Sequence, residues 1–160
     1  MENIVLPALH IREASLEDLN IIVDFNLALA LETENRTLDK KILTQSIQTI
    51  LQNPAKGVYL LACFGEKVVG QLMYVYEWST WRNANFMWLT DLYILPNYRK
   101  KGIFSLLSKH AMDLYHKNEN VVGLRFCVDK ENTAVVPLYK KAGWKESNYN
   151  LWEIKKDGCQ

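Results

Sequence analysis

The residues with the clearest potential for chemistry lie in one stretch, Thr90 to Ser105. The stretch begins as an apolar, aromatic-rich run that Pro96-Asn97 ends, and an amphipathic segment opens after Arg99-Lys100-Lys101-Gly102. This order predicts a strand, a tight basic turn and a helix. A helix start offers unpaired backbone N–H groups and the positive end of the helix dipole, and the glycine allows close approach. We therefore expect a diphosphate site; a solvated basic turn that caps a surface helix is the alternative.

The basic turn is part of a resemblance to a known family. The run Arg99-Lys-Lys-Gly102-Ile-Phe104 is similar to the Arg/Gln-x-x-Gly-x-Gly/Ala loop of the GNAT superfamily of acetyl-CoA-dependent N-acetyltransferases. Further residues resemble the family's downstream Asn…Leu-Tyr-x-x-x-Gly-Phe pattern: Asn132, Leu138, Tyr139, Gly143 and Trp144. Together the motifs span about Asn85 to Trp144. Phe104 departs from the pattern, because Gly or Ala is usual at that position.

The resemblance implies a cosubstrate, acetyl-CoA (coenzyme A), and its contacts. Its pyrophosphate would lie on the loop and helix start, at Arg99, Lys100, Lys101, Gly102, Ile103, Phe104 and Ser105. Backbone groups of Leu92, Tyr93 and Ile94 resemble the strand end that hydrogen-bonds the acetyl and pantetheine amides. Asn132 would hold the pantetheine through its amide, or simply cap the following helix.

Acyl transfer to an amine needs a neutral nitrogen, a polarised thioester carbonyl and a proton for the departing thiolate. The resemblance implies that Tyr139 supplies this proton; packing against its neighbours is the alternative. Asp91, on the strand of the basic turn, is our first candidate for the base, and Glu77 is the second, each directly or through water. Asp91 could equally be a structural carboxylate that accepts N–H bonds.

The acceptor side is suggested by carboxylates near aromatic residues. Glu32 and Glu34 lie between the first two predicted helices, and Glu77 precedes Trp78. In the family these regions line the acceptor channel. Carboxylates and tryptophans favour a cationic amine by charge and by cation–π contact, although acids at helix ends are commonly just solvated. Parts of Tyr74 to Gly102 resemble the diamine and polyamine acetyltransferases, but Thr90 stands where those enzymes have a glutamate.

Composition limits the other possibilities. A chain of 160 residues with 49% hydrophobic residues is most simply one domain, residues 1–160. The net charge of +1 gives no argument for nucleic acid or an anionic membrane. No apolar run approaches a membrane span, and three widely spaced cysteines indicate a reducing cytoplasm. Neither the histidines nor the cysteines indicate a metal site.

The order of patterns predicts a mixed α/β (α+β) domain. We expect strands at 9–14, 57–64, 67–77, 85–95 and 121–128, with a final strand or hairpin at 144–154. We expect helices at 16–31, 37–52 and 103–117, and a short one after Asn132 or Thr133 that Gly143 ends. This order matches the GNAT fold, a mostly antiparallel sheet with a central, splayed parallel strand pair, here 85–95 and 121–128, flanked by helices.

The sequence therefore predicts a cytoplasmic N-acetyltransferase that transfers acetyl directly to a primary amine, preferably a small cationic one. Protein or peptide amines are the rival acceptors. A module that senses acetyl-CoA without turnover is the rival from another class. A homodimer is implied only at the level of the family.

Overall fold

The computed structural model describes residues 8–129, 136–156 and 158. The described residues fall in two compact units, one that ends at Phe126 and one that begins at Cys127. The single domain expected from length and composition remains a prediction.

The first unit is built on a five-stranded sheet with the order β1-β2-β3-β4-β5. The strands are β1 (Leu9–Glu13), β2 (Val58–Phe64), β3 (Lys67–Ser79), β4 (Ala84–Ile94) and β5 (Val121–Phe126). The pairs β1–β2, β2–β3 and β3–β4 are antiparallel, whereas β4 and β5 are parallel. The mixed sheet and the predicted parallel pair are thus confirmed, with β5 at the edge of the described sheet.

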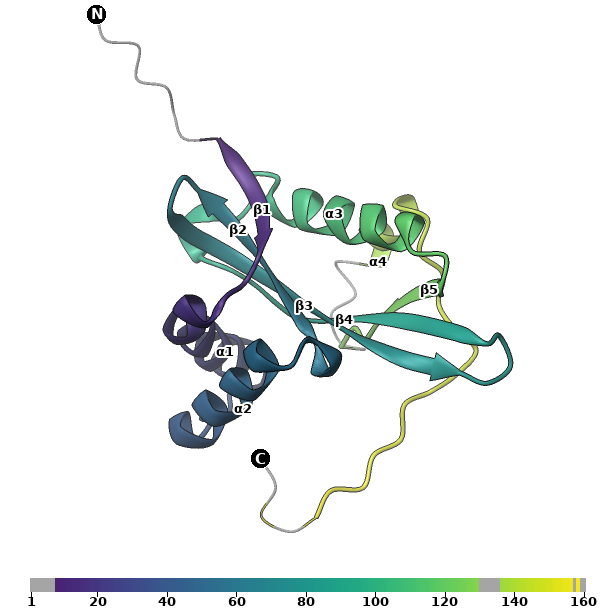
Figure 1. Cartoon of the computed structure of the whole chain (residues 1–160), viewed down its shortest axis with the longest axis horizontal. Helices are drawn as coiled ribbons and strands as arrows, with labels where there is room; N and C mark the ends of the chain where they lie inside the picture. The colour runs from purple at the N-terminus through teal and green to yellow at the C-terminus, as the bar shows by residue number, and fades with distance from the viewer. Residues whose placement is uncertain (1–7, 130–135, 157, 159–160) are drawn as a thin grey trace, which may run out of the picture. The chain divides into compact units, whose positions relative to one another are not determined.

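Helices cover both faces of this sheet (Figure 1). On one face lie α1 (Leu19–Glu34), which follows the 3-10 turn η1 (Leu16–Asp18), and α2 (Lys40–Gln52). On the other face lies α3 (Ile103–Lys117). Two buried clusters match these layers, one around Leu60, Met87 and Leu107, the other around Ile22, Ile47 and Leu61. Burial of these side chains supplies the main driving force for the fold.

Two short 3-10 turns complete the unit. The first, η2 (Pro54–Lys56), separates α2 from β2, because Asn53-Pro54 cannot continue a helix. The second, η3 (Pro96–Tyr98), begins the connection from β4 to α3. Both contain proline at the start, where its missing N–H costs nothing.

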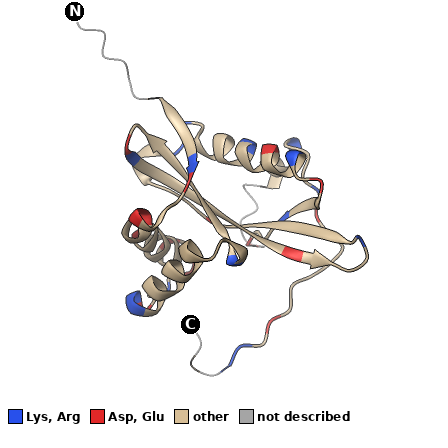
Figure 2. Cartoon of the chain, in the orientation of Figure 1, with Lys and Arg blue, Asp and Glu red and all other residues tan. Residues whose placement is uncertain are grey.

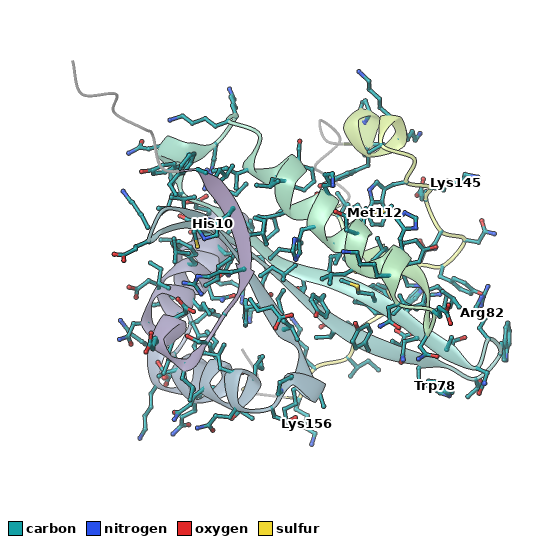
Figure 3. All side chains as sticks on the ribbon, turned by 45° about the horizontal axis from the view of Figure 1, so that its top comes forward. His10, Trp78, Arg82, Met112, Lys145 and Lys156 are labelled. Atoms are coloured by element: carbon teal, nitrogen blue, oxygen red, sulfur yellow. The ribbon has the colours of Figure 1, made fainter. Side chains whose placement is uncertain are left out.

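The β3–β4 hairpin is longer than predicted. The strands expected at 67–77 and 85–95 leave residues 78–84 as their connection, but β3 continues to Ser79 and β4 starts at Ala84. Trp78 and Arg82 lie at the far end of this hairpin (Figure 3). Trp78 pairs with Asn85 in the ladder and extends the strand, whereas Trp81 lies in the turn.

The second unit contains one described helix, α4 (Val136–Lys141). Pro137 is its second residue, which explains how a proline is tolerated there. The prediction of a strand or hairpin over 144–154 is wrong for this structure, since residues 144–156 contain neither. An apolar pattern forms a strand only where a partner takes up its backbone hydrogen bonds, and Trp152 and Ile154 are fully exposed.

Candidate active site

The candidate site is built around a bulge in β4. Gln71 lies opposite Tyr93 and Met73 lies opposite Thr90, so the register between β3 and β4 shifts by one residue. Asp91 is in this bulge with φ of 51°, a left-handed conformation that few residues other than glycine adopt. Bulges and such backbone conformations are concentrated at functional sites, where they re-aim groups of the strand.

Two hydroxyl groups, the buried one of Tyr59 and the exposed one of Thr90, hold Asp91 in place. The Tyr59 hydroxyl donates to Oδ2 of Asp91 at 2.7 Å, and the Thr90 hydroxyl donates to Oδ1 at 3.0 Å. Nδ2 of Asn26 in turn donates to the Tyr59 hydroxyl at 3.3 Å. Burial, and next the charge of Asp91, raise the pKa of Tyr59 far above its ordinary value, so the phenol keeps its proton. The carboxylate is therefore fixed by two O–H donors.

Gln71 fixes the backbone of the bulge. Its Nε2 donates to the backbone oxygen of Asp91 at 3.1 Å. The side chain is fully buried, and its Oε1 has no hydrogen-bond partner within the part of the chain that the structure describes. Burial of a polar side chain costs free energy unless the side chain forms hydrogen bonds. Here the Gln71 amide offsets part of that cost by binding the irregular peptide of the bulge.

The pairing of the two parallel strands ends just before the bulge. The ladder between β4 and β5 ends at the pair Leu89 and Phe126, although β4 continues to Ile94. The backbone of Leu92, Tyr93 and Ile94 therefore has no β5 partner among the described residues of the first unit. These are the residues that we expected to bind the acetyl and pantetheine amides. The geometry leaves their strand edge available for an extended ligand.

The basic turn ends at the start of α3 with a backbone suited to an anion. Lys100 and Gly102 have φ of 60° and 80°, and Gly102 is the N-cap residue. Within the described residues no side chain caps this helix, and a Cβ built on Gly102 would meet no atom within 4 Å. Open space before uncapped N–H groups, beside three cations, fits a diphosphate.

Two predicted loop residues have side chains with different surroundings. Ile103 is 1% exposed and packs in the core with Leu107, so only its backbone can face a ligand. Phe104 is 39% exposed. The bulky residue at this unusual position therefore points at least partly out of the core, and the helix start does not need a small residue to pack.

Glu32 contacts the basic turn. Its Oε2 accepts a hydrogen bond from Nη2 of Arg99 at 2.6 Å, and its Oε1 accepts one from the Tyr93 hydroxyl at 3.2 Å. Nε of Arg99 donates to the backbone oxygen of Ile94 at 2.9 Å. Burial and the charge of Glu32 raise the pKa of Tyr93. Glu32, which we expected to bind the acceptor amine, is thus hydrogen-bonded to Arg99, which we expected to bind the diphosphate.

Glu77 belongs to a second cluster on the sheet. It accepts hydrogen bonds from Nε1 of Trp88 at 2.6 Å and from Nη1 of Arg125 at 3.1 Å. The Arg125 guanidinium also lies 3.4 Å from the ring centre of Phe86. Trp78 is adjacent to Glu77 in the chain, but successive strand residues point to opposite faces. Trp88, rather than Trp78, is the tryptophan that accompanies Glu77.

Of the remaining predicted residues, Glu34 lies outside both clusters. Glu34 is exposed and pairs with Arg36 at 3.1 Å. Asn132 lies outside the described residues. Tyr139 is in α4 of the second unit, and desolvation raises the pKa of its phenol. Its predicted role as acid stays a prediction.

Sequence reasoning missed Tyr59, Gln71 and Arg125. Tyr59 resembled any other core aromatic in an apolar strand. Gln71 and Arg125 carried a signal, because each is a single polar residue inside an apolar run, Val68 to Tyr76 and Val121 to Val128. Such residues are expected to have a specific partner.

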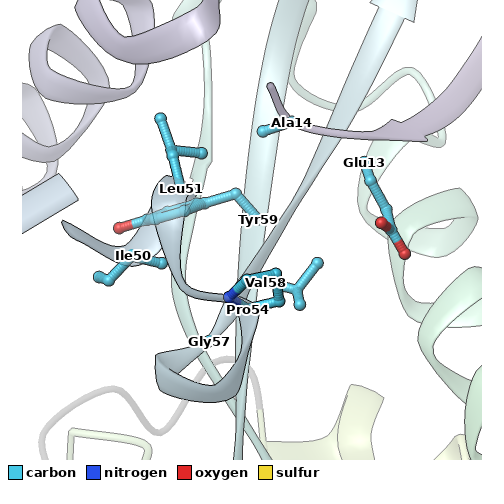
Figure 4. A pocket seen from close by; sticks show the side chains of 8 residues that line it. All are labelled: Glu13, Ala14, Ile50, Leu51, Pro54, Gly57, Val58 and Tyr59. Carbon is cyan, nitrogen blue, oxygen red and sulfur yellow. The ribbon is translucent and has the colours of Figure 1, made fainter. Parts of the chain in front are cut away.

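A further feature of the described residues shares Tyr59 with this site. A shallow pocket of about 50 Å³ lies between β1, β2 and the end of α2 (Figure 4). Its lining residues are Glu13, Ala14, Ile50, Leu51, Pro54, Gly57, Val58 and Tyr59. It has room for a water molecule or two, not for a coenzyme. No group of three or more His, Cys, Asp and Glu in the described chain could hold a metal ion.

Charged residues of both signs are spread over the described part of the chain. Lys and Arg segments are interspersed with Asp and Glu segments along the helices and the sheet (Figure 2). Among the described helices, none has the length and apolar character needed to cross a membrane.

An open strand edge next to a glycine-capped, basic helix start is the arrangement expected for an acyl-CoA-dependent transferase. The sequence model of the acetyltransferase (GNAT) family matches residues 25–144. The chain belongs to this family, which confirms the resemblance, the fold class and the enzyme class predicted from sequence.

Solved structures have the same fold. A possible acetyltransferase from Clostridium difficile 630 is 41% identical, with a TM-score of 0.87 over 92% of this chain and 97% of that one. A predicted acetyltransferase with acetyl-CoA from Clostridium acetobutylicum is 19% identical, with a TM-score of 0.73 over 92% and 96%. The second likeness shows the fold alone.

Curated relatives match over a shorter region. The thialysine N-epsilon-acetyltransferases of Bos taurus and Mus musculus are each 34% identical over 79 residues, which is 49% of this chain and 45% of theirs. The chain thus spans about half the length of the curated relatives that it matches.

Proposed function

We propose that the protein transfers an acetyl group from acetyl-CoA directly to a primary amine, with a small cationic amine as acceptor. The observation that carries this proposal is the bulged end of β4, free of β5 and followed by the glycine-capped start of α3. It combines an edge for an extended ligand with a cradle for a diphosphate.

Acetyl-CoA supplies the thioester whose carbonyl carbon accepts the amine nitrogen, with formation of the C–N bond and loss of the thiolate. Backbone N–H groups of Leu92 to Ile94 would bind and polarise the acyl carbonyl. The amine has to lose a proton, since an alkylamine has a pKa near that of lysine, about 10.4. Asp91 is the one carboxylate of β4, and it is held by Tyr59 and Thr90. We propose it as acceptor of that proton, through water.

The preference for a cationic amine is supported by two observations. Glu32 and Glu77 are partly exposed carboxylates beside Tyr93 and Trp88, and each is paired with an arginine, Arg99 or Arg125, that it would have to release to bind a cation. The curated relatives are named for acetylation of the ε-nitrogen of thialysine, which is a primary amine. Protein or peptide amines remain the rival acceptors.

Free-thiol release from acetyl-CoA by the purified protein tests the proposal. The amine panel contains thialysine, lysine, 1,5-diaminopentane, spermidine, an aminoglycoside and peptides with lysine or a free N-terminus. Release with a small cationic amine supports the proposal, and release only with peptides replaces the acceptor class. If acetyl-CoA binds but no amine is acetylated, the protein is better described as an acetyl-CoA sensor. Gly102→Asp, which places a carboxylate in the diphosphate cradle, is the control for background hydrolysis.

A further inference from the structure

The ion pair between Glu32 and Arg99 connects the two ends of the candidate site. Glu32 lies in the last turn of α1, and Arg99 is the first residue of the basic turn, 67 residues later. The distance of 2.6 Å between Nη2 of Arg99 and Oε2 of Glu32 is short even for a charge-assisted hydrogen bond. Both side chains are partly exposed, 41% for Glu32 and 42% for Arg99, so a ligand can reach either one.

Glu32 depends on this partner. It lies near the negative end of the α1 dipole, where a carboxylate is unfavourable, and α1 has no basic residue in its last turn. Arg99 supplies the missing positive charge from outside the helix. The Tyr93 hydroxyl occupies the other carboxylate oxygen. In this arrangement the charge of Glu32 is largely neutralised toward a further cation.

Arg99 is also placed to bind the diphosphate. It opens the turn whose N–H groups and cations fit a diphosphate, and guanidinium groups bind phosphate and carboxylate with the same donor geometry. Its Nε stays tied to the backbone oxygen of Ile94, so the outer nitrogens are the ones that can change partner. A diphosphate carries more charge than one carboxylate and therefore competes with Glu32 for them.

We propose that Arg99 exchanges Glu32 for the diphosphate when acetyl-CoA binds, and that the released Glu32 then holds the cationic acceptor amine. This inference rests on the proposed function and adds an order to it, because the acceptor position gains its negative charge only in the acetyl-CoA complex. Glu32 acts as a specificity residue for cations. By thermodynamic reciprocity, a cationic amine also tightens coenzyme binding by the same factor.

The Glu32→Gln variant separates this exchange from a merely structural pair. Glutamine keeps the size of the side chain and an oxygen for the Tyr93 hydroxyl, but it no longer competes strongly for Arg99. Calorimetric titration with coenzyme A, which cannot react, should therefore show about two- to five-fold tighter binding than in the wild type. The matched control is Asp24→Asn, which removes another α1 carboxylate with an exposed lysine partner, Lys40, at 3.4 Å. It should bind coenzyme A as the wild type does.

Two further titrations show whether the effect passes through Arg99 and reaches the acceptor. In an Arg99→Gln background, Glu32→Gln should no longer tighten coenzyme A binding. Saturating 1,5-diaminopentane should tighten coenzyme A binding to the wild type by about two- to five-fold, and should leave the Glu32→Gln variant unchanged.

The outcomes distinguish the inference from the proposed function. A wild-type protein that does not bind coenzyme A overturns both. If the wild type and Glu32→Gln bind coenzyme A with equal affinity, the exchange is overturned and the transferase proposal stands. The same holds if Glu32→Gln still tightens coenzyme A binding in the Arg99→Gln background. Failure of the diamine to tighten wild-type binding overturns the role of Glu32 in holding the acceptor.

Discussion

The Tyr59 hydroxyl donates a hydrogen bond of 2.7 Å to Asp91, across 32 residues of sequence and between β2 and the bulge of β4. This bond joins the hydrophobic layer under α1 and α2 to the irregular peptide at the candidate site, because Tyr59 packs with Ile22 and Leu61. The position of Asp91 is thus set by the core rather than by the surface.

Tyr59→Phe should lower the free energy of unfolding by about 1–2 kcal/mol at pH 7, since Asp91 loses an O–H donor and Asn26 loses one of its two acceptors. It should also lower turnover, because the bulge loses a support. The pH dependence has a definite sign. The folded-state pKa of Tyr59 is raised, so the stability that it contributes is fully present below its unfolded pKa of about 10 and is lost as the pH rises above that value.

Urea unfolding at pH 7 and pH 10.5 measures both effects. The wild type and the variant should differ less at the higher pH. Tyr149→Phe, which removes an exposed phenol, is the control and should differ little from the wild type at either pH. A gap that stays constant with pH would contradict the raised pKa.

Asp18→Asn tests the partly buried ion pair between Asp18 and Arg12. Both oxygens of Asp18 accept hydrogen bonds of 2.8 Å from Arg12, and one also accepts the backbone N–H of Ser15. The Arg12 hydrogen bond holds the pKa of Asp18 below its usual range. A carboxylate whose pKa is lower in the folded state stabilises the fold at every pH above its unfolded-state pKa. The free energy of unfolding of the variant should therefore be about 1–2 kcal/mol lower at pH 7.

This difference between wild type and Asp18→Asn should shrink as the pH falls below about 4, where the wild-type carboxylate also becomes protonated. Urea midpoints between pH 7 and pH 3 follow the effect. The exposed Asp24→Asn provides the comparison, because its pair with Lys40 should contribute little at any pH. Equal losses in both variants would show that Arg12 and Asp18 are not a special pair.

Gly123→Ala should disturb the Glu77 cluster by steric contact alone. A Cβ at position 123 would lie 2.7 Å and 2.9 Å from ring atoms of Phe86, the ring on which Arg125 stacks. We expect a loss of about 1–3 kcal/mol of stability in urea unfolding. The double variant Gly123→Ala with Phe86→Leu removes the ring atoms and should be more stable than additivity of the single changes predicts. Strict additivity would contradict this packing account.

Sequence patterns located most of the fold because burial imposes a period on the chain. The predicted helix over 103–117 has the observed bounds of α3, since its apolar spacing matches the face that packs on the sheet. The predicted end of β3 was less accurate, because Trp78 still pairs with Asn85 and the strand continues to Ser79. The apolar pattern of 144–154 gave no indication that a partner strand would be missing.

The clusters of the site could not be predicted, because they join residues distant in the chain. Glu32 and Arg99 were each singled out, one for the amine and one for the phosphates, yet nothing in their spacing indicated that they would bind each other. Likewise Glu77 and Trp78 are sequence neighbours on opposite faces, while Glu77 contacts Trp88 and Arg125. The positive φ of Asp91 depends on the bulge, which is a property of two paired strands.

Two substitutions at Gly102 separate backbone strain from charge in the diphosphate cradle. Both alanine and aspartate have to adopt φ of 80°, and a Cβ meets no described atom there, so both should cost about 1 kcal/mol of stability. Only aspartate adds negative charge before the start of α3. Calorimetry with coenzyme A should therefore show modest weakening for Gly102→Ala and a further loss of at least about ten-fold for Gly102→Asp. Similar affinities in the two variants would exclude this turn as the phosphate site.

Tyr139→Phe tests the predicted acid, and the expected effect is limited by the pKa of the phenol. Desolvation raises this pKa above its ordinary value, which already exceeds that of an ordinary thiol, so proton transfer from Tyr139 to a thiolate is uphill. We therefore expect kcat to fall by about 10- to 100-fold rather than to vanish, since water can supply the proton instead. Affinity for coenzyme A should change little. An unchanged kcat would remove Tyr139 from the reaction, and a lost affinity with unchanged kcat would make it a binding residue.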